Sequence, residues 1–284
     1  HDIRDTASVL LAEEEATYSF IEDMILSATA PFKSKRIHIG MDEAWDMGRG
    51  NYMNKTGYKD PFEIFTNHLN RVIEITKKYN FKPMMWSDMF FRISSSEHRY
   101  YSKDTVIPPD VMEKIPKEVQ LVYWHYGEEP GCDGYMLDKH IDTERDVIFA
   151  GGLWTWSVHL PEINYAMKST NEALLECKKR NIKEMITTIW SNDNSEMDPF
   201  ASLLGIWYTA EHCYNDDVCM ETLKNRFEFL TGANFNAFME MGEYNNIFDD
   251  GREYKNFHER FMGKKLFWQD VMEGLVDEFL YKQP

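Results

Sequence analysis

The sequence lacks long hydrophobic runs and has little positive charge. No apolar stretch approaches the ~20 residues that cross a bilayer, and no basic segment followed by an apolar one opens the chain. Lys and Arg total 31 against 48 Asp and Glu, which gives a net charge of −17. This balance repels phosphate backbones and anionic lipid surfaces. We therefore expect neither nucleic acid nor membrane among the partners.

Cysteine is scarce, and the usual metal and nucleophile motifs are missing. The 4 Cys residues show no CxxC spacing, and the 9 His residues form neither His-x-His nor HExxH. No GxSxG elbow for a serine nucleophile occurs either. The cysteines are typical of free thiols in a reducing compartment. We expect a cytoplasmic protein that needs no metal and no cofactor.

Aromatic residues, in contrast, are plentiful. The chain of 284 residues contains 8 Trp, 15 Tyr and 18 Phe. Acidic chains rich in Trp often bind sugars, because the apolar face of a pyranose ring stacks on indole while carboxylates bind its hydroxyls. A large aromatic core would give the same composition. Composition alone leaves both interpretations open.

Short apolar segments alternate with helical patterns along most of the chain. A parallel sheet buried on both faces produces this alternation. The expected strands are 36–43, 82–90, 119–126, 146–154 and 184–192. The expected helices are 6–29, 61–79, 133–144, 162–181 and 199–213.

Each expected strand ends in polar or aromatic residues, which is typical of a (β/α)8 TIM barrel. An open Rossmann-type sheet competes, but no strand is followed by GxGxxG. A closed barrel needs eight strands, so we expect the C-terminal five βα units of an α/β barrel over 1–214 and an α-helical region over 215–284. The chain then reads as a piece of a longer polypeptide. The sheet edges would be covered by a missing N-terminal half or by a second copy in a homodimer.

The strongest chemical signal is the segment His-Ile-Gly-Met-Asp-Glu over 38–43. Asp42 and Glu43 are adjacent carboxylates at a strand end, so their pKa values should separate, with one group charged and the other protonated. Breaking a glycosidic bond requires this division. An exposed acidic pair with no catalytic role would show the same two residues.

This segment resembles the motif of glycoside hydrolase family 20 exo-β-N-acetylhexosaminidases. The stretches HIGMDEAWDMGRGNY, KPMMWSDMFF and LLGIWYTAEH are similar to the intracellular-type members with a helical domain after the barrel. The resemblance implies retaining hydrolysis of terminal β-linked GlcNAc or GalNAc through an oxazolinium intermediate. Glu43 would be the general acid and base, and Asp42 would orient the substrate's own 2-acetamido group.

The same resemblance assigns a sugar-binding shell. Trp86, Trp154 and Trp190 would wall the pocket, with Trp124 as a weaker member. The family's acetamide-binding Tyr is replaced at the expected position, so Tyr126, or less favourably Tyr123, would supply the hydroxyl. Asn192 and Asp193 stand where the family's last strand carries Glu, and they are expected to bind sugar hydroxyls. His38 is expected to be structural, hydrogen-bonded behind Asp42.

Two other functions fit part of the pattern. A non-catalytic carbohydrate-binding barrel would keep the Trp pocket but usually lose one of the two carboxylates. A retaining glycosidase with an enzymic nucleophile would use Glu128 or Asp88 as its second carboxylate. The expected partner in every case is a glycan or amino-sugar oligosaccharide.

Overall fold

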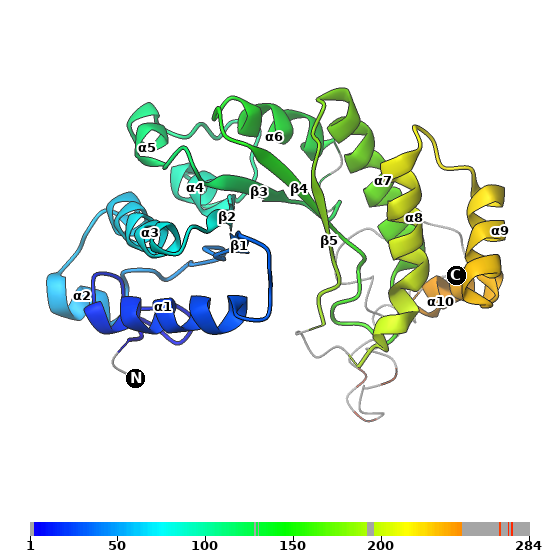
Figure 1. Cartoon of the computed structure of the whole chain (residues 1–284), viewed down its shortest axis with the longest axis horizontal. Helices are drawn as coiled ribbons and strands as arrows, with labels where there is room; N and C mark the ends of the chain where they lie inside the picture. The colour runs from blue at the N-terminus through cyan, green and yellow to red at the C-terminus, as the bar shows by residue number, and fades with distance from the viewer. Residues whose placement is uncertain are drawn as a thin grey trace. The chain divides into compact units, whose positions relative to one another are not determined.

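The computed structural model describes residues 3–127, 129, 131–191, 196–245, 267, 272 and 274. Its five strands form one sheet in chain order, as Figure 1 shows. They are β1 (Arg36–His38), β2 (Lys82–Trp86), β3 (Gln120–Trp124), β4 (Val147–Gly152) and β5 (Met185–Thr188). The pairs β1–β2 and β2–β3 are parallel. Sequential strand order with intervening helices is the pattern of a (β/α)8 barrel, of which the described residues contain a part.

Helices connect and follow the strands. Those up to β4 are α1 (Glu15–Thr29), α2 (Asn51–Thr56), α3 (Pro61–Lys78), α4 (Asp88–Ser94), α5 (Pro109–Lys114) and α6 (Cys132–Ile141). Those after it are α7 (Ile163–Lys179), η1 (Pro199–Ser202), α8 (Leu203–Tyr214), α9 (Met220–Thr231), α10 (Phe235–Met241) and η2 (Gly242–Asn245). None of the helices described is both long enough and apolar enough to cross a membrane.

Local sequence explains the best-predicted helix, α3. The Asp60 side chain caps it by accepting hydrogen bonds from the backbone N–H groups of Phe62 and Glu63. Pro61 occupies the first turn, where its missing N–H costs nothing, and Lys77 and Lys78 lie in the last turn, where they interact favourably with the helix dipole. Its apolar face packs on α1.

Four predicted boundaries are wrong by four residues or more, and one of them is the end of the strand predicted over 184–192, which stops at Thr188. The strand predicted over 36–43 ends at His38, because Gly40 and Met41 have φ of +74° and +80° and leave the extended region. The strand predicted over 82–90 ends at Trp86, and α4 begins at Asp88. The helix predicted over 6–29 begins only at Glu15.

The chain divides into two compact units. The first contains residues 1–124, 134–149 and 182–184, and the second contains 125–133, 150–181 and 185–284. Each unit has its own buried clusters. In the first, Tyr18, Ile21 and Ile25 of α1 pack with Val72 of α3 and with Phe81.

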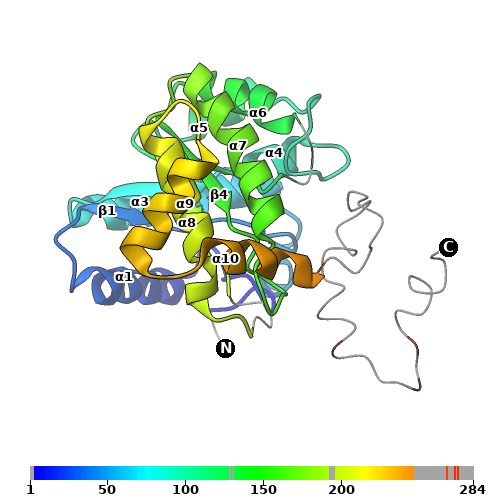
Figure 2. The ribbon, with the colours of Figure 1, turned by 90° about the vertical axis from the view of Figure 1, so that its right-hand side faces the viewer.

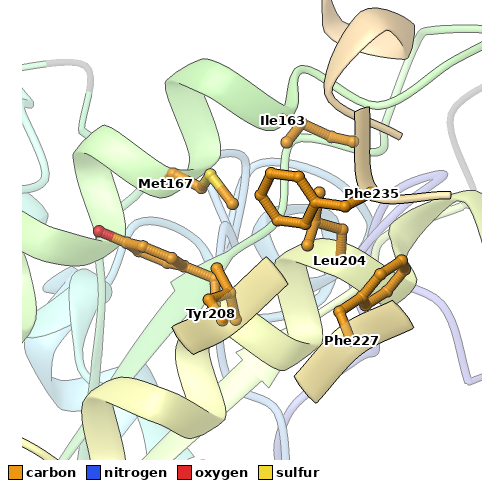
Figure 3. Close-up of a cluster of buried hydrophobic side chains, with 7 residues drawn as sticks. Ile163, Met167, Leu204, Tyr208, Phe227 and Phe235 are labelled. Atoms are coloured by element: carbon orange, nitrogen blue, oxygen red, sulfur yellow. The ribbon is translucent and has the colours of Figure 1, made fainter. Parts of the chain in front are cut away.

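The helices after the last strand pack on barrel helices within the second unit. Figure 3 shows side chains of α7, α8, α9 and α10 meeting in one cluster. Its members are Ile163, Met167, Leu204, Tyr208, Leu223, Phe227 and Phe235. Figure 2 shows α8, α9 and α10 close to one another. An α-helical segment after 214 is therefore present, while a domain boundary at 214/215 stays a prediction.

Candidate active site

The backbone just after β1 has an unusual conformation. Gly40, Met41 and Glu43 all have positive φ, and Glu43 has a φ of 48°. Non-glycine residues rarely adopt this region, and they keep it only where the surroundings enforce it, as at active sites. The result is a sharp turn on which Asp42 and Glu43 both lie exposed. The predicted acidic pair thus lies on a turn after β1 and not within the strand.

A buried carboxyl group, Asp88, is hydrogen-bonded to the backbone of this turn. The Glu43 backbone N–H donates a hydrogen bond to Asp88 Oδ2 at 3.0 Å. Asp88 is fully buried at the start of α4, and its Oδ1 has no hydrogen-bond partner among the described residues. From the sequence, Asp88 was expected only as an alternative nucleophile. Its supporting role depends on burial, which the sequence does not show.

Burial also sets the charge states of these carboxyls. It raises the pKa of Asp88 to about 7, and the negative charge of Asp42 adds to the rise, while hydrogen bonds from the Glu43 amide and the Trp124 indole oppose it. Desolvation likewise raises the pKa of Asp42, against a backbone hydrogen bond that lowers it. The site therefore holds several carboxyls in different environments, as acid–base chemistry requires.

Tyr100 contacts the Glu43 side chain and Trp45 contacts Tyr100, and neither was among the predicted site residues. The Tyr100 hydroxyl lies 3.4 Å from Glu43 Oε1, and the Trp45 indole N–H donates to that same hydroxyl. Burial and the Glu43 charge raise the pKa of Tyr100, so it remains a neutral donor. Trp45 lies two residues after the end of the motif at Glu43, so its position in the sequence could have identified it. Tyr100 lies in a loop with no such signal.

Two predicted Trp residues lie in the same unit as this acidic turn. Trp86 is buried and packs on His38 with ring centroids 4.4 Å apart. Trp124 is half-buried against Tyr100, at a centroid distance of 5.5 Å. His38 Nδ1 accepts from the Gly40 N–H, and burial lowers the pKa of His38 to about 4. His38 is therefore neutral at pH 7 and supports the turn through Gly40.

The loop after Glu43 is held by Asp5. This buried carboxylate accepts hydrogen bonds from the N–H groups of Gly48, Gly50 and Tyr52, at 2.6, 3.1 and 2.8 Å. A Cβ on Gly50 would lie 2.1 Å from the Asp5 carbonyl oxygen, so only glycine fits there. The segment before α1 thus fixes, through Asp5, the backbone of the loop that follows Trp45.

The second unit holds an aromatic cluster made of Tyr126, Trp154, Trp156 and Tyr165. Trp154 is fully buried with a φ of 51°, and its indole N–H donates to the Tyr126 carbonyl oxygen at 2.7 Å. Its ring lies 4.6 Å from that of Trp156 and 4.9 Å from that of Tyr165. Trp154 thus packs against its aromatic neighbours and has no exposed ring face on which a ligand could stack.

Tyr126 and Trp190 form the accessible part of that region. The Trp190 indole N–H donates to the Tyr126 hydroxyl at 2.9 Å, and Trp190 is 36% exposed. The Tyr126 hydroxyl is thus oriented in part by the Trp190 indole. Tyr123 is fully buried, which disfavours it as the alternative. Glu128, Asn192 and Asp193 lie outside the described residues.

A cavity of about 410 Å³ opens along β1, the first strand of the sheet. Asp42 and Glu43 contribute to one part of its wall, but most of the lining is apolar and comes from α1, β1, α3 and the segments before α1 and after β1. A sugar site needs aromatic faces and several polar partners, so this lining does not suit a sugar ring. Among the residues that the structure describes, no three His, Cys, Asp or Glu side chains gather as metal ligands would.

Comparison with known proteins agrees with this geometry. Residues 2–136 match the model of the glycosyl hydrolase family 20 catalytic domain. No curated protein sequence matches the chain. The fold is similar to the crystal structure of β-N-acetylhexosaminidase from Bacteroides fragilis NCTC 9343, at a TM-score of 0.51 and 13% identity.

That likeness covers 82% of this chain but only 46% of the other, so this chain spans less than half the length of the solved enzyme. At this identity the likeness concerns the fold. The family match includes β1, β2 and β3, and thereby Asp42, Glu43, Trp86, Asp88 and Trp124. Residues 2–136, just under half of the chain, therefore match the catalytic domain of glycosyl hydrolase family 20.

Proposed function

We propose that this protein is an exo-acting β-N-acetylhexosaminidase. It releases terminal β-linked N-acetylglucosamine or N-acetylgalactosamine from a glycan and retains the anomeric configuration. The observation that carries the proposal is the acidic turn after β1, where Asp42 and Glu43 are exposed and the Glu43 amide is anchored on buried Asp88. No metal or cofactor enters the reaction.

Glu43 is the general acid in this mechanism. It protonates the glycosidic oxygen as the leaving group departs and then, as a base, activates the water that completes hydrolysis. The neutral Tyr100 hydroxyl, 3.4 Å from Oε1, can donate to the carboxylate that forms after proton transfer. This contact stabilises Glu43 in its charged form and restricts its side chain.

Asp42 acts on the substrate's acetamido group. As the carbonyl oxygen of that group attacks C1 and the glycosidic bond breaks, positive charge develops on the oxazolinium ring, and its N–H needs an anionic partner. Asp42 is the exposed carboxylate adjacent to Glu43. A preformed carboxylate at the position of developing charge stabilises the transition state more than the ground state.

The burial of Asp88 argues against Asp88 as an enzymic nucleophile. A nucleophilic carboxylate must reach the anomeric carbon, but Asp88 is fully buried and its Oδ2 accepts the Glu43 amide. Its pKa of about 7 also leaves it largely protonated in mildly acidic solution, where it cannot attack. Asp88 is a positioning residue in this mechanism.

Tyr126 and Trp190 bind the acetamido group and the apolar sugar face in this proposal. Both are partly accessible, and the indole of Trp190 orients the Tyr126 hydroxyl. Stacking on an aromatic face and one hydrogen bond to the acetamide oxygen are the contacts that distinguish GlcNAc from glucose.

Hydrolysis of aryl β-GlcNAc and aryl β-glucoside by the full chain at neutral pH tests the proposal. We expect cleavage of the first and no measurable cleavage of the second. Asp42→Asn should reduce kcat by about 10²- to 10³-fold, because it removes a charge that acts in the transition state. Asp46→Asn, on the neighbouring loop, serves as the matched control. Cleavage of both substrates, or full activity of Asp42→Asn, would contradict the mechanism.

A further inference from the structure

A second cavity lies beside Glu43. Its volume is about 310 Å³, and its wall includes Trp45, Arg49, Asp60, Arg92 and His98. The predicted mechanism uses none of these residues. Trp45 is 57% exposed, which is unusual for a large aromatic residue beside a catalytic motif. The cavity therefore offers an aromatic surface that no part of the fold requires.

Tyr100 connects this cavity to the proposed acid. Its hydroxyl lies 3.4 Å from Glu43 Oε1 and accepts a hydrogen bond from the Trp45 indole. Trp45 also follows Glu43 by two residues in the chain. A general acid faces the leaving-group side of the scissile bond, since it protonates the oxygen that departs. A cavity next to the acid is placed to receive the leaving group.

The charge of the cavity is positive, although the whole chain carries −17. Arg49 and Arg92 line it, and within the described ranges neither forms an ion pair with a carboxylate. The one acidic side chain in the wall, Asp60, already caps α3 by accepting two backbone N–H groups. The arginines are thus available for an external anion.

Arg92 is held in place for this role. Its guanidinium lies 5.1 Å from the centroid of Tyr100 and 5.9 Å from that of Trp45, and it also donates to the His98 carbonyl oxygen. Stacking and one hydrogen bond orient the group without neutralising it. A planar guanidinium with free N–H groups binds a carboxylate or a sulfate through paired hydrogen bonds.

We propose that this cavity is a leaving-group subsite for a sugar that carries an anionic substituent, a carboxylate or a sulfate. The sugar ring stacks on Trp45, and Arg92 and Arg49 bind the anion. This inference rests on the proposed function, because it assigns Glu43 to the leaving-group side. It makes the natural substrate a glycan in which the N-acetylhexosamine is linked to an acidic sugar.

A binding experiment tests the subsite independently of catalysis. Methyl β-glucuronide, methyl β-glucoside and methyl β-glucoside 6-sulfate are titrated into the full chain by calorimetry. We expect at least one anionic glycoside to bind ten-fold or more tightly than the neutral one, and the tighter of the two identifies the anion. Arg92→Gln and Arg49→Gln should each remove most of this preference. The control Arg71→Gln, an arginine paired with Glu15, should keep it.

A kinetic experiment then separates the two proposals. The substrates are GlcNAc β-linked to glucuronate and GlcNAc β-linked in the same way to glucose. The proposal predicts a kcat/KM ratio above ten, falling towards one in Arg92→Gln. Cleavage of both substrates at equal rates would overturn the subsite and leave the hydrolase intact. Equal binding of neutral and anionic glycosides, or an unchanged preference in both arginine variants, would also overturn it.

Discussion

The acidic turn after β1 and the aromatic cluster after β4 are built in opposite ways. At the turn, the carboxylates of Asp42 and Glu43 are exposed, and the buried carboxyl of Asp88 accepts a hydrogen bond from the turn's backbone. In the cluster, Trp154 is itself fully buried, and the exposed residue is Trp190, which lies outside the cluster and donates to the Tyr126 hydroxyl. Both regions have a positive φ at a non-glycine residue.

The difference shows that a residue at a strand end can act on substrate or can hold the residues that do. Exposure separates the two roles, since Trp154 is 0% and Trp190 is 36% exposed. Asp88 and Trp154 have corresponding roles. Asp88 accepts a hydrogen bond from the Glu43 backbone N–H, and Trp154 donates one to the Tyr126 backbone carbonyl. Substitutions of the exposed residues should change activity, and substitutions of the buried ones should change stability.

The largest effect is expected at Glu43. Glu43→Gln removes the proposed general acid and should reduce kcat for a GlcNAc disaccharide by about 10²- to 10⁴-fold. Because the side chain is exposed, the unfolding free energy should change by less than about 0.5 kcal/mol. Steady-state kinetics and urea unfolding measure both quantities. A stable variant with full activity would show that Glu43 is not the acid.

The largest effect on stability, as opposed to activity, is expected at Trp154. Trp154→Ala should reduce the unfolding free energy by about 3–5 kcal/mol, because it empties a fully buried volume and removes the donor to the Tyr126 carbonyl. Trp190→Ala should cost less than about 1.5 kcal/mol but raise KM. Urea unfolding of both variants checks the contrast. Equal losses of stability would mean that exposure does not separate the two Trp roles.

A smaller effect is expected at Asp88. Asp88→Ala leaves the Glu43 N–H without its acceptor and should cost about 1–3 kcal/mol. Asp88→Asn keeps an acceptor oxygen at the same position and should recover most of the loss. Thermal or urea unfolding of the pair at pH 7 measures the difference. Identical behaviour of the two variants would argue against the hydrogen bond.

Asp88 also predicts a pH dependence of stability. Its pKa is about 7 in the folded protein and about 4 in an unfolded chain. The folded state therefore holds more protons between these values, and its contribution to stability falls as pH rises from 4 to 7, by up to about 1.4 kcal/mol per pH unit. Asp88→Asn should flatten this part of the profile. An unchanged slope in the variant would contradict the raised pKa.

An effect of similar size is expected at Gly152. A Cβ there would lie 2.7 Å from Tyr126 Cδ1 and 3.0 Å from Trp156 Cζ3, and these rings cannot move freely. Gly152→Ala should cost about 1–3 kcal/mol and raise KM through Tyr126. Gly205→Ala meets only the flexible end of Leu153 and is the matched control. Equal stability of both variants would show that the cluster is more loosely packed than described.

The alternation of strands and helices was predictable because apolar periodicity reports which residues are buried. All five predicted strands are present, and Asp42 and Glu43 lie on the turn that follows β1. The strand boundaries were wrong after His38 and Trp86, where backbone angles and not hydrophobicity end the strand. Positive φ at Met41 leaves no sign in the residue types.

The depth of each side chain was not predictable. Trp86, Trp154 and Trp190 look alike in the sequence, since each follows an apolar run, yet their exposure differs because different neighbours cover them. Asp88 was visible in the segment Trp86-Ser-Asp, but only the fold shows that its oxygen meets the Glu43 amide. Tyr100 comes from a loop whose path is set by tertiary contacts.

The most direct test of acetamide-assisted hydrolysis is the rate with aryl β-glycosides whose N-acyl group carries zero, one, two or three fluorine atoms. Fluorine withdraws electrons from the acetamide oxygen and weakens it as a nucleophile, while the leaving group stays the same. The mechanism with Asp42 and Glu43 predicts that kcat/KM falls steeply with each fluorine. A rate independent of fluorination would show that the substrate's own acetamide does not attack, and would contradict the assignment of Asp42.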